Sequence, residues 1–235
     1  MIRARNEDSI LTYEDPSGKV ALFAVADGMG GHKDGDLASR MIVSHLEAWI
    51  TALPESAEYQ LTAILDDAVA QLMAINREIY KTLNRDQICG STLVLLLLTE
   101  NEYGVVSVGD SRVYFSRGRE FRQLTRDDVW ENQEKNRSRY SEEELLRHPN
   151  RGKLVRAVGV SQELHYSLLS GRVRRGDRFA LCSDGVYKYC QREVIRKAML
   201  RLLWRDAEKV RNYLMRTVYQ GGAGDNASLV LVKFS

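Results

Sequence analysis

Four short apolar runs in this chain each lie next to an aspartate that has a glycine beside it. These aspartates are Asp27, Asp110, Asp184 and Asp225. Short bounded apolar runs are typical of buried strands, and an adjacent glycine lets the backbone turn where a strand ends. We therefore expect the four carboxylates to converge at one rim of a sheet. Clustered carboxylates repel one another unless a cation neutralises them, and all-oxygen sites suit magnesium or manganese.

Other interpretations of these motifs are weaker. A single Asp-Gly pair is more often a turn than a metal site, but four recurrences at strand ends favour the metal. The glycine-rich loop at 28–35 lacks the spacings of nucleotide-binding loops, and no EF-hand run is present. His32 lies in this loop beside the acidic residues, which makes it a candidate for proton transfer.

Bulk properties narrow the class of protein. A chain of 235 residues is expected to form one domain over 1–235, and a net charge of +2 gives no signal for nucleic acid. Its 3 cysteines lack CxxC spacing, which indicates reduced thiols rather than a zinc site. The most apolar run, Leu93 to Leu98, is far shorter than the ~20 residues that span a bilayer. We expect a cytoplasmic monomer without membrane or nucleic-acid partners.

The order of the expected elements indicates sheets that are covered by helices. A turn at 16–18 predicts a hairpin of strands at 9–13 and 20–26, and Asp36 is the expected N-cap of the helix that follows. Short polar turns in the middle of the chain predict antiparallel pairing. Helices are expected at 37–53, 57–83, 191–203 and 207–219, and further strands at 91–99, 103–108, 113–115, 121–124, 164–173, 178–182 and after 224.

Eight sequence blocks, in order, resemble the metal-dependent protein phosphatase family, the type 2C Ser/Thr phosphatases, in its small bacterial form. They lie at 3–9, 25–32, 90–92, 108–114, 123–127, 154–159, 181–185 and 224–228. The resemblance implies an α+β fold: a four-layer α/β/β/α sandwich of two central, mainly antiparallel sheets flanked by helices. It also implies two Mn²⁺ or Mg²⁺ ions at one end of the sandwich.

The resemblance assigns roles to individual residues. It implies that Asp27 bridges the two ions, that the carbonyl of Gly28 is a ligand, and that Asp184 and Asp225 are further carboxylate ligands. Asp110 matches the acid that helps to hold a third, weaker ion.

Four further assignments concern the rim of the site. Glu7 and Asp8 are expected to hold metal-bound waters or to brace the ligands, Arg3 to grip the substrate phosphate, and His32 to donate a proton to the leaving oxygen. The polar segment at 126–152 matches a flap subdomain that overhangs the site, although Asp128 stands where the family commonly has histidine.

The implied function is metal-dependent hydrolysis of phosphoserine and phosphothreonine in proteins, by an activated water, opposing a bacterial Ser/Thr kinase. Two alternatives stay open. One is a catalytically weak member that acts as a phosphoprotein-binding module, which the lack of the family's usual strand ahead of Arg3 favours. The other is a phosphatase of the same fold that acts on anti-sigma-factor antagonists.

Overall fold

Two antiparallel sheets form the centre of the molecule. The computed structural model describes residues 5–30, 34–54, 59–84, 87–202 and 205–235. The first sheet has the order β1-β2-β4-β5-β8, with β3 paired to β2, and the second has the order β10-β9-β6-β7. Their bounds are β1 Asp8–Glu14, β2 Val20–Met29, β3 Gly90–Ser91, β4 Leu93–Thr99, β5 Glu102–Val108, β6 Arg112–Arg117, β7 Glu120–Gln123, β8 Ser167–Arg172, β9 Arg178–Cys182 and β10 Leu229–Lys233.

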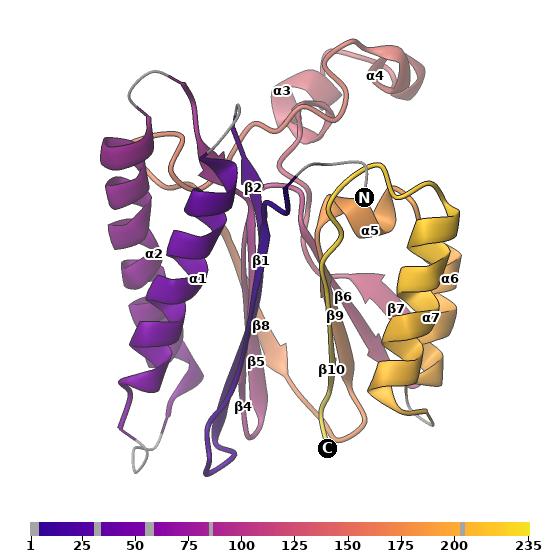
Figure 1. The fold of residues 1–235 in the computed structure, drawn as a ribbon. Coiled ribbons are helices and arrows are strands. Elements are labelled where there is room, and N and C mark those ends of the chain that lie inside the picture. Colours follow the sequence, from indigo (N-terminus) through magenta and orange to yellow (C-terminus); the bar gives the residue numbers. More distant parts are fainter. Residues whose placement is uncertain (1–4, 31–33, 55–58, 85–86, 203–204) are drawn as a thin grey trace.

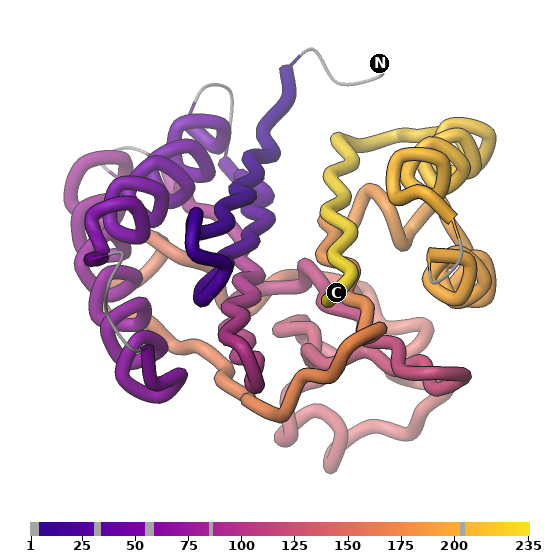
Figure 2. The backbone as a smooth tube through the Cα atoms, turned by 90° about the horizontal axis from the view of Figure 1, so that it is seen from below, coloured from indigo at the N-terminus to yellow at the C-terminus, as the bar shows by residue number. Residues whose placement is uncertain are grey.

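Helices cover the outer face of each sheet, so the predicted four-layer sandwich is confirmed (Figure 1). The pair α1 (Gly35–Thr51) and α2 (Leu61–Leu83) lies on the first sheet, and the pair α6 (Arg192–Arg201) and α7 (Ala207–Gln220) lies on the second. Figure 2 shows the two helical layers on opposite sides of the strands. None of the helices in the described ranges is long and apolar enough to cross a bilayer.

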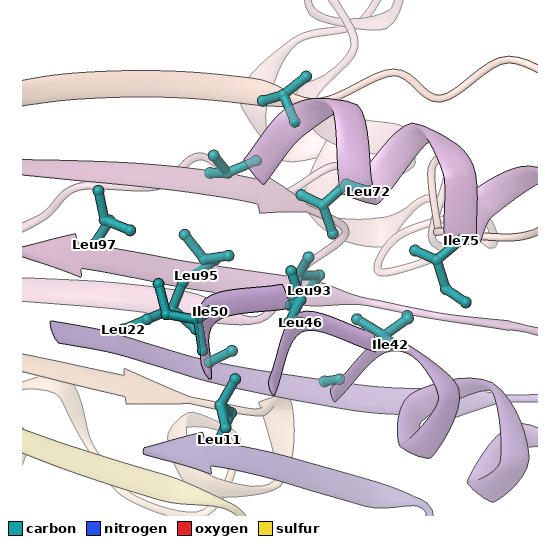
Figure 3. Packing of buried hydrophobic residues seen from close by; sticks show 14 of the residues in the cluster. Leu11, Leu22, Ile42, Leu46, Ile50, Leu72, Ile75, Leu93, Leu95 and Leu97 are labelled. Carbon is teal, nitrogen blue, oxygen red and sulfur yellow. The ribbon is translucent and has the colours of Figure 1, made fainter. Parts of the chain in front are cut away.

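Strand β4 shows why the layers form. All seven of its residues are buried, because helices cover one face and the second sheet covers the other. Successive side chains of a strand point to opposite faces. Leu93, Leu95 and Leu97 accordingly pack among the side chains of α1 and α2 (Figure 3). Val94 and Leu96 pack in the core between the sheets.

Helix starts differ from the sequence expectation. The N-cap of α1 is Asp34, not Asp36, and its side chain makes no capping hydrogen bond. Asp36 instead lies in the first turn and pairs with Arg40 at 3.0 Å, where a carboxylate complements the helix dipole. The helix predicted from 57 begins at Leu61, and residues 55–58 lie outside the described part. A short helix that was not predicted, α5 (Asp184–Tyr187), directly follows β9.

The segment 126–152 extends beyond one end of the sandwich and carries α3 and α4 (Figure 1). It contains a 3₁₀ turn at Trp130–Asn132, α3 (Glu134–Arg137) and α4 (Glu142–Arg147). The predicted helix start at Ser141 is confirmed, because Ser141 and Glu144 form a reciprocal capping box. The rings of Trp130 and His148 stack with centroids 3.8 Å apart. Tyr140 packs against both rings, so aromatic contacts join the 3₁₀ turn to the residues around α4.

Candidate metal centre

Five aspartates from both sheets meet at the end of the sandwich that lies nearest the 126–152 segment. Asp27 lies on β2, and Asp8 lies opposite it in the register of β1. Asp184 begins α5 just after β9, Asp225 lies in the turn that leads to β10, and Asp110 follows β5. Asp27 interacts electrostatically with each of the other four. The predicted convergence of carboxylates is therefore present.

Burial and crowding oppose the ionisation of three of these carboxylates, those of Asp27, Asp110 and Asp8. Burial raises the pKa of Asp27 to about 10, aided by the negative charges of Asp8, Asp184, Asp110 and Asp225. Burial and the charge of Asp184 likewise raise the pKa of Asp110 to about 6. Burial also raises the pKa of Asp8, and the charge of Asp184 adds to this effect. Asp27 is therefore ionised near neutral pH only when cations offset the negative charge around it.

Hydrogen bonds between the sheets hold the cluster together. The Ser183 hydroxyl, beside Asp184, donates to Asp8 Oδ2 at 2.8 Å and accepts from the Ser228 amide at 3.0 Å. The Glu7 amide donates to Asn226 Oδ1 at 3.0 Å, beside Asp225. The start of β1 is thereby joined to the turns that carry Asp184 and Asp225.

Thr92 positions the carboxylate-bearing backbone of the first sheet. Its Oγ1 accepts from the Asp27 amide at 3.1 Å, and its own amide donates to the Asp27 carbonyl at 2.8 Å. The hydroxyls of Thr92 and Ser111 lie 2.7 Å apart, beside Asp110. Gly109 has a φ of +94° and lies so close to Thr92 that an added Cβ would be 2.9 Å from the Thr92 Cβ.

Gly28 lies in a backbone cradle. Its amide donates to the Glu7 carbonyl at 3.0 Å. A Cβ at Gly28 would lie 2.0 Å from the Gly35 carbonyl oxygen and 2.8 Å from that of Glu7. Only glycine fits between these carbonyls, and the close approach brings the loop that follows Asp27 against the start of β1.

Tyr187 and Arg112 connect the centre to the root of the 126–152 segment. The Tyr187 hydroxyl lies 3.1 Å from Asp110 Oδ2, and the Arg112 guanidinium lies 3.4 Å from the Tyr187 ring centroid. Arg112 donates to both carboxylate oxygens of Asp127, at 3.0 and 2.6 Å. Asp128 adds a second connection, since its Oδ2 accepts a hydrogen bond from the amide of Gly109, which precedes Asp110, at 3.1 Å.

The donor set fits hard divalent cations, although its side chains are not arranged as a closed ligand shell. Within the described ranges, no group of three or more His, Cys, Asp or Glu side chains is placed to hold an ion as it stands. Asp184 pairs with Lys188, Asp110 with Tyr187 and Asp8 with Ser183. Two oxygens, Asp8 Oδ1 and Asp184 Oδ1, are nevertheless buried without a hydrogen-bond partner. Unpartnered buried carboxylate oxygens are suitable ligands for a cation that turns these side chains inward.

The structure describes most, but not all, of the residues singled out from the sequence. Arg3 and His32 lie outside the described residues. Glu7 is half-buried, and its Oε1 would lie 3.3 Å from a Cβ at Gly35, which places this carboxylate beside the cradle of Gly28. The metal roles of Asp27, Gly28, Asp184, Asp225, Asp110, Glu7 and Asp8 stay predictions.

Sequence reasoning assigned no role to Ser183, Tyr187 or Lys188. Ser183 and Lys188 are the N-cap and C-cap of α5 and Tyr187 is its last residue, and apolar periodicity does not reveal so short a helix. Ser183 contacts Asp8 and Tyr187 contacts Asp110, and only the tertiary structure shows these pairs.

Replacing Asp27 by asparagine is expected to stabilise the metal-free protein. Between pH 4 and about 10 the folded protein keeps a proton on Asp27 that the unfolded chain has lost, so this residue lowers the free energy of unfolding as pH rises through that window. Asparagine mimics the protonated form. We expect the free energy of unfolding of D27N at pH 7 to exceed that of wild type by up to about 4 kcal/mol, since this pH lies about three units above the ordinary pKa of aspartate and each unit corresponds to about 1.4 kcal/mol. Urea unfolding in chelator from pH 5 to 9 measures this difference.

The control for D27N is the same measurement with saturating Mn²⁺. Bound ions favour ionised Asp27, so the order of stability should reverse, with wild type gaining more from the metal than D27N. An equal destabilisation of D27N at every pH, with and without Mn²⁺, would contradict the electrostatic account.

Gly28→Ala is expected to weaken Mn²⁺ binding at least about tenfold, because the new methyl group must displace backbone rather than a mobile side chain. Isothermal titration calorimetry measures the affinity. Gly118→Ala is a control for a strained glycine substitution that lacks such contacts. Gly118 has a φ of +56°, but its Cβ would have nothing within 4 Å, so the Mn²⁺ affinity should be unchanged. Unaltered affinity in both variants would show that the cradle of Gly28 does not shape the centre.

Comparisons with known proteins agree with this geometry. The model of the protein phosphatase 2C family matches residues 3–220. The serine/threonine protein phosphatase PstP of Mycobacterium tuberculosis is 33% identical over 232 residues, which cover 98% of this chain and 42% of that protein. The serine/threonine phosphatase stp of Listeria innocua is 30% identical over 239 residues, covering 99% of this chain and 91% of the relative.

A crystal structure of the PstP catalytic domain in complex with two manganese ions has a TM-score of 0.79 and 30% sequence identity, and the match covers 100% of this chain and 94% of that one. The chain spans less than half the length of the mycobacterial PstP protein but nearly the whole Listeria relative. Family match and fold agree over almost the entire sequence. The chain therefore belongs to the protein phosphatase 2C family.

Proposed function

We propose that this chain is a metal-dependent protein serine/threonine phosphatase that hydrolyses phosphoserine and phosphothreonine with two Mn²⁺ or Mg²⁺ ions, and a third at Asp110. The observation that carries the proposal is the gathering of five aspartates at one end of the sandwich. Burial and the negative charges of the other four raise the pKa of Asp27 to about 10. The solved relative with two manganese ions supports cations as the means of offsetting this charge.

Different residues of the centre would bind the ions and position the ligands. Asp27, with Asp184 and Asp225, would hold the ions, and the Gly28 carbonyl would add a neutral oxygen. Ser183 and Asn226 would keep these ligands and those of β1 at one end of the sandwich. When bound, divalent ions lower the pKa of water and offset charge on a phosphoryl group.

Substrate contacts come from the rim of this centre. Arg3, whose planar guanidinium can bind two phosphate oxygens, and His32, as proton donor to the leaving oxygen, keep the roles that the resemblance implies. The 126–152 segment would act as a flap subdomain of a single domain over 1–235. A groove of about 480 Å³ at its root is lined by Arg126, Asp128, Lys135 and Arg156, among others, and offers both signs of charge to a peptide.

Turnover is better supported than the binding-module alternative. Mycobacterial and Listeria relatives are named as serine/threonine phosphatases, and every predicted carboxylate ligand is present. Phosphorylated proteins are therefore the proposed substrates. Opposition to a bacterial Ser/Thr kinase, a role in signalling, a cytoplasmic location and a monomeric state complete the proposal. Action on anti-sigma-factor antagonists remains an alternative substrate choice within the same chemistry.

Asp184→Asn is expected to lower Mn²⁺-dependent hydrolysis of p-nitrophenyl phosphate and of a phosphothreonine peptide at least about 100-fold, because it removes a negatively charged ligand. Chelator should abolish the wild-type rate, and Mn²⁺ should restore it. Asp206→Asn is the matched control. It removes the same charge from the α7 N-cap, where asparagine caps equally well, and should leave the rate unchanged. A wild-type protein that binds Mn²⁺ and phosphopeptide without turnover would favour the binding module.

A further inference from the structure

Lys188 places an ammonium group against the carboxylate cluster. It is the C-cap residue of α5, one helical turn after Asp184, and its Nζ forms an ion pair with Asp184 Oδ2. The Asp184 side chain is only 14% exposed, whereas that of Lys188 is 51% exposed. The lysine therefore reaches from solvent to a largely buried carboxylate.

Lys188 also interacts electrostatically with other carboxylates of the cluster. Burial alone would lower the pKa of Lys188, but the hydrogen bond to Asp184 and the charges of Asp184, Asp110 and Asp225 raise it. In return, the charge of Lys188 partly offsets the raised pKa of Asp110. The ammonium thus partly neutralises the same carboxylates that divalent ions would neutralise.

The same carboxylate cannot serve both cations fully. Asp184 Oδ2 is engaged by Lys188, while Asp184 Oδ1 is buried and unpartnered. A divalent ion next to this carboxylate would repel an ammonium at hydrogen-bond distance. Lysine has a flexible four-carbon stem, and here half of the side chain is already in solvent, so it can move away without unfolding α5.

We propose that Lys188 is a built-in counter-ion for this centre: it pairs with Asp184 in the metal-free protein and is displaced when a divalent ion takes that carboxylate. The inference rests on the metal-binding part of the proposed function. Lys188 then has opposite effects on two states. It stabilises the metal-free fold by reducing carboxylate repulsion, and it weakens metal binding because the ion must displace it.

Two measurements on Lys188→Gln test these opposite effects. In chelator, K188Q should unfold at a lower temperature than wild type, with Tm reduced by about 2–4 °C. In calorimetric titration of the metal-free protein with Mn²⁺ alone, K188Q should bind about 3- to 10-fold more tightly. Both differences should shrink as NaCl is raised, because salt screens a half-exposed pair.

Two further variants separate this role from general effects of charge. Lys197→Gln removes the same charge from the exposed face of α6 and should change neither measurement. Lys188→Arg keeps the cation and should bind Mn²⁺ within about twofold of wild type. If K188Q does not fold, Lys188→Met, which retains the aliphatic stem, replaces it in both measurements.

The outcomes distinguish this inference from the proposed function. A wild-type protein that binds no Mn²⁺ would overturn both. A wild-type protein that binds Mn²⁺, together with a K188Q variant that binds it equally or more weakly, would overturn the role of Lys188 alone and leave the phosphatase assignment intact.

Discussion

Repulsion among five buried or half-buried aspartates is the constraint on which this structure depends. Two sheets with their own cores bring these residues to one end of a sandwich, and no hydrophobic gain comes from placing them there. The energetic cost of placing them together is largest at Asp27, where burial and four neighbouring carboxylates raise the pKa to about 10. The fold tolerates this cluster because apolar packing elsewhere is extensive and because polar contacts hold Asp8, Asp110 and Asp184.

Those contacts also explain how two sheets can make one centre. Ser183 hydrogen-bonds both to Asp8 on the first sheet and to Ser228, which precedes β10 of the second sheet. The Asn226 side chain accepts a hydrogen bond from the Glu7 amide. Neither link depends on a bound cation. The ligands are thus kept near one another in the metal-free protein, while Lys188 and Tyr187 occupy carboxylates that a cation would use. A site built in this way would gather its donors before a cation binds and would complete its geometry only on binding.

Much of this arrangement could be predicted from the sequence because local signals and the global fold agree. The hairpin turn at 16–18, the alternating contacts of β4 and the apolar stripe of α2 each follow from one period or one turn. Four Asp-Gly neighbours at strand ends pointed to the carboxylate cluster. Resemblance then supplied the layer order, which periodicity alone does not determine.

Other features depend on tertiary contacts and could not be predicted. Asp34 rather than Asp36 is the N-cap of α1. This helix begins at Gly35, whose carbonyl packs against Gly28, and local capping signals do not reveal such a contact. The helix α5 is a single turn, too short for any periodic signal. Lys188 looks like an ordinary surface lysine in the sequence, and only the fold shows that its ammonium faces Asp184, Asp110 and Asp225.

The most direct test of this account is the number of protons released when Mn²⁺ binds. Calorimetric titrations at pH 7 in buffers of different ionisation enthalpy would measure both stoichiometry and proton release. At least two ions should bind per chain with net release of protons, because the raised pKa of Asp27 keeps this residue protonated at pH 7 in the metal-free protein and it must ionise to bind. Proton release should diminish as pH approaches 10. Binding without proton release, or of a single ion, would contradict it.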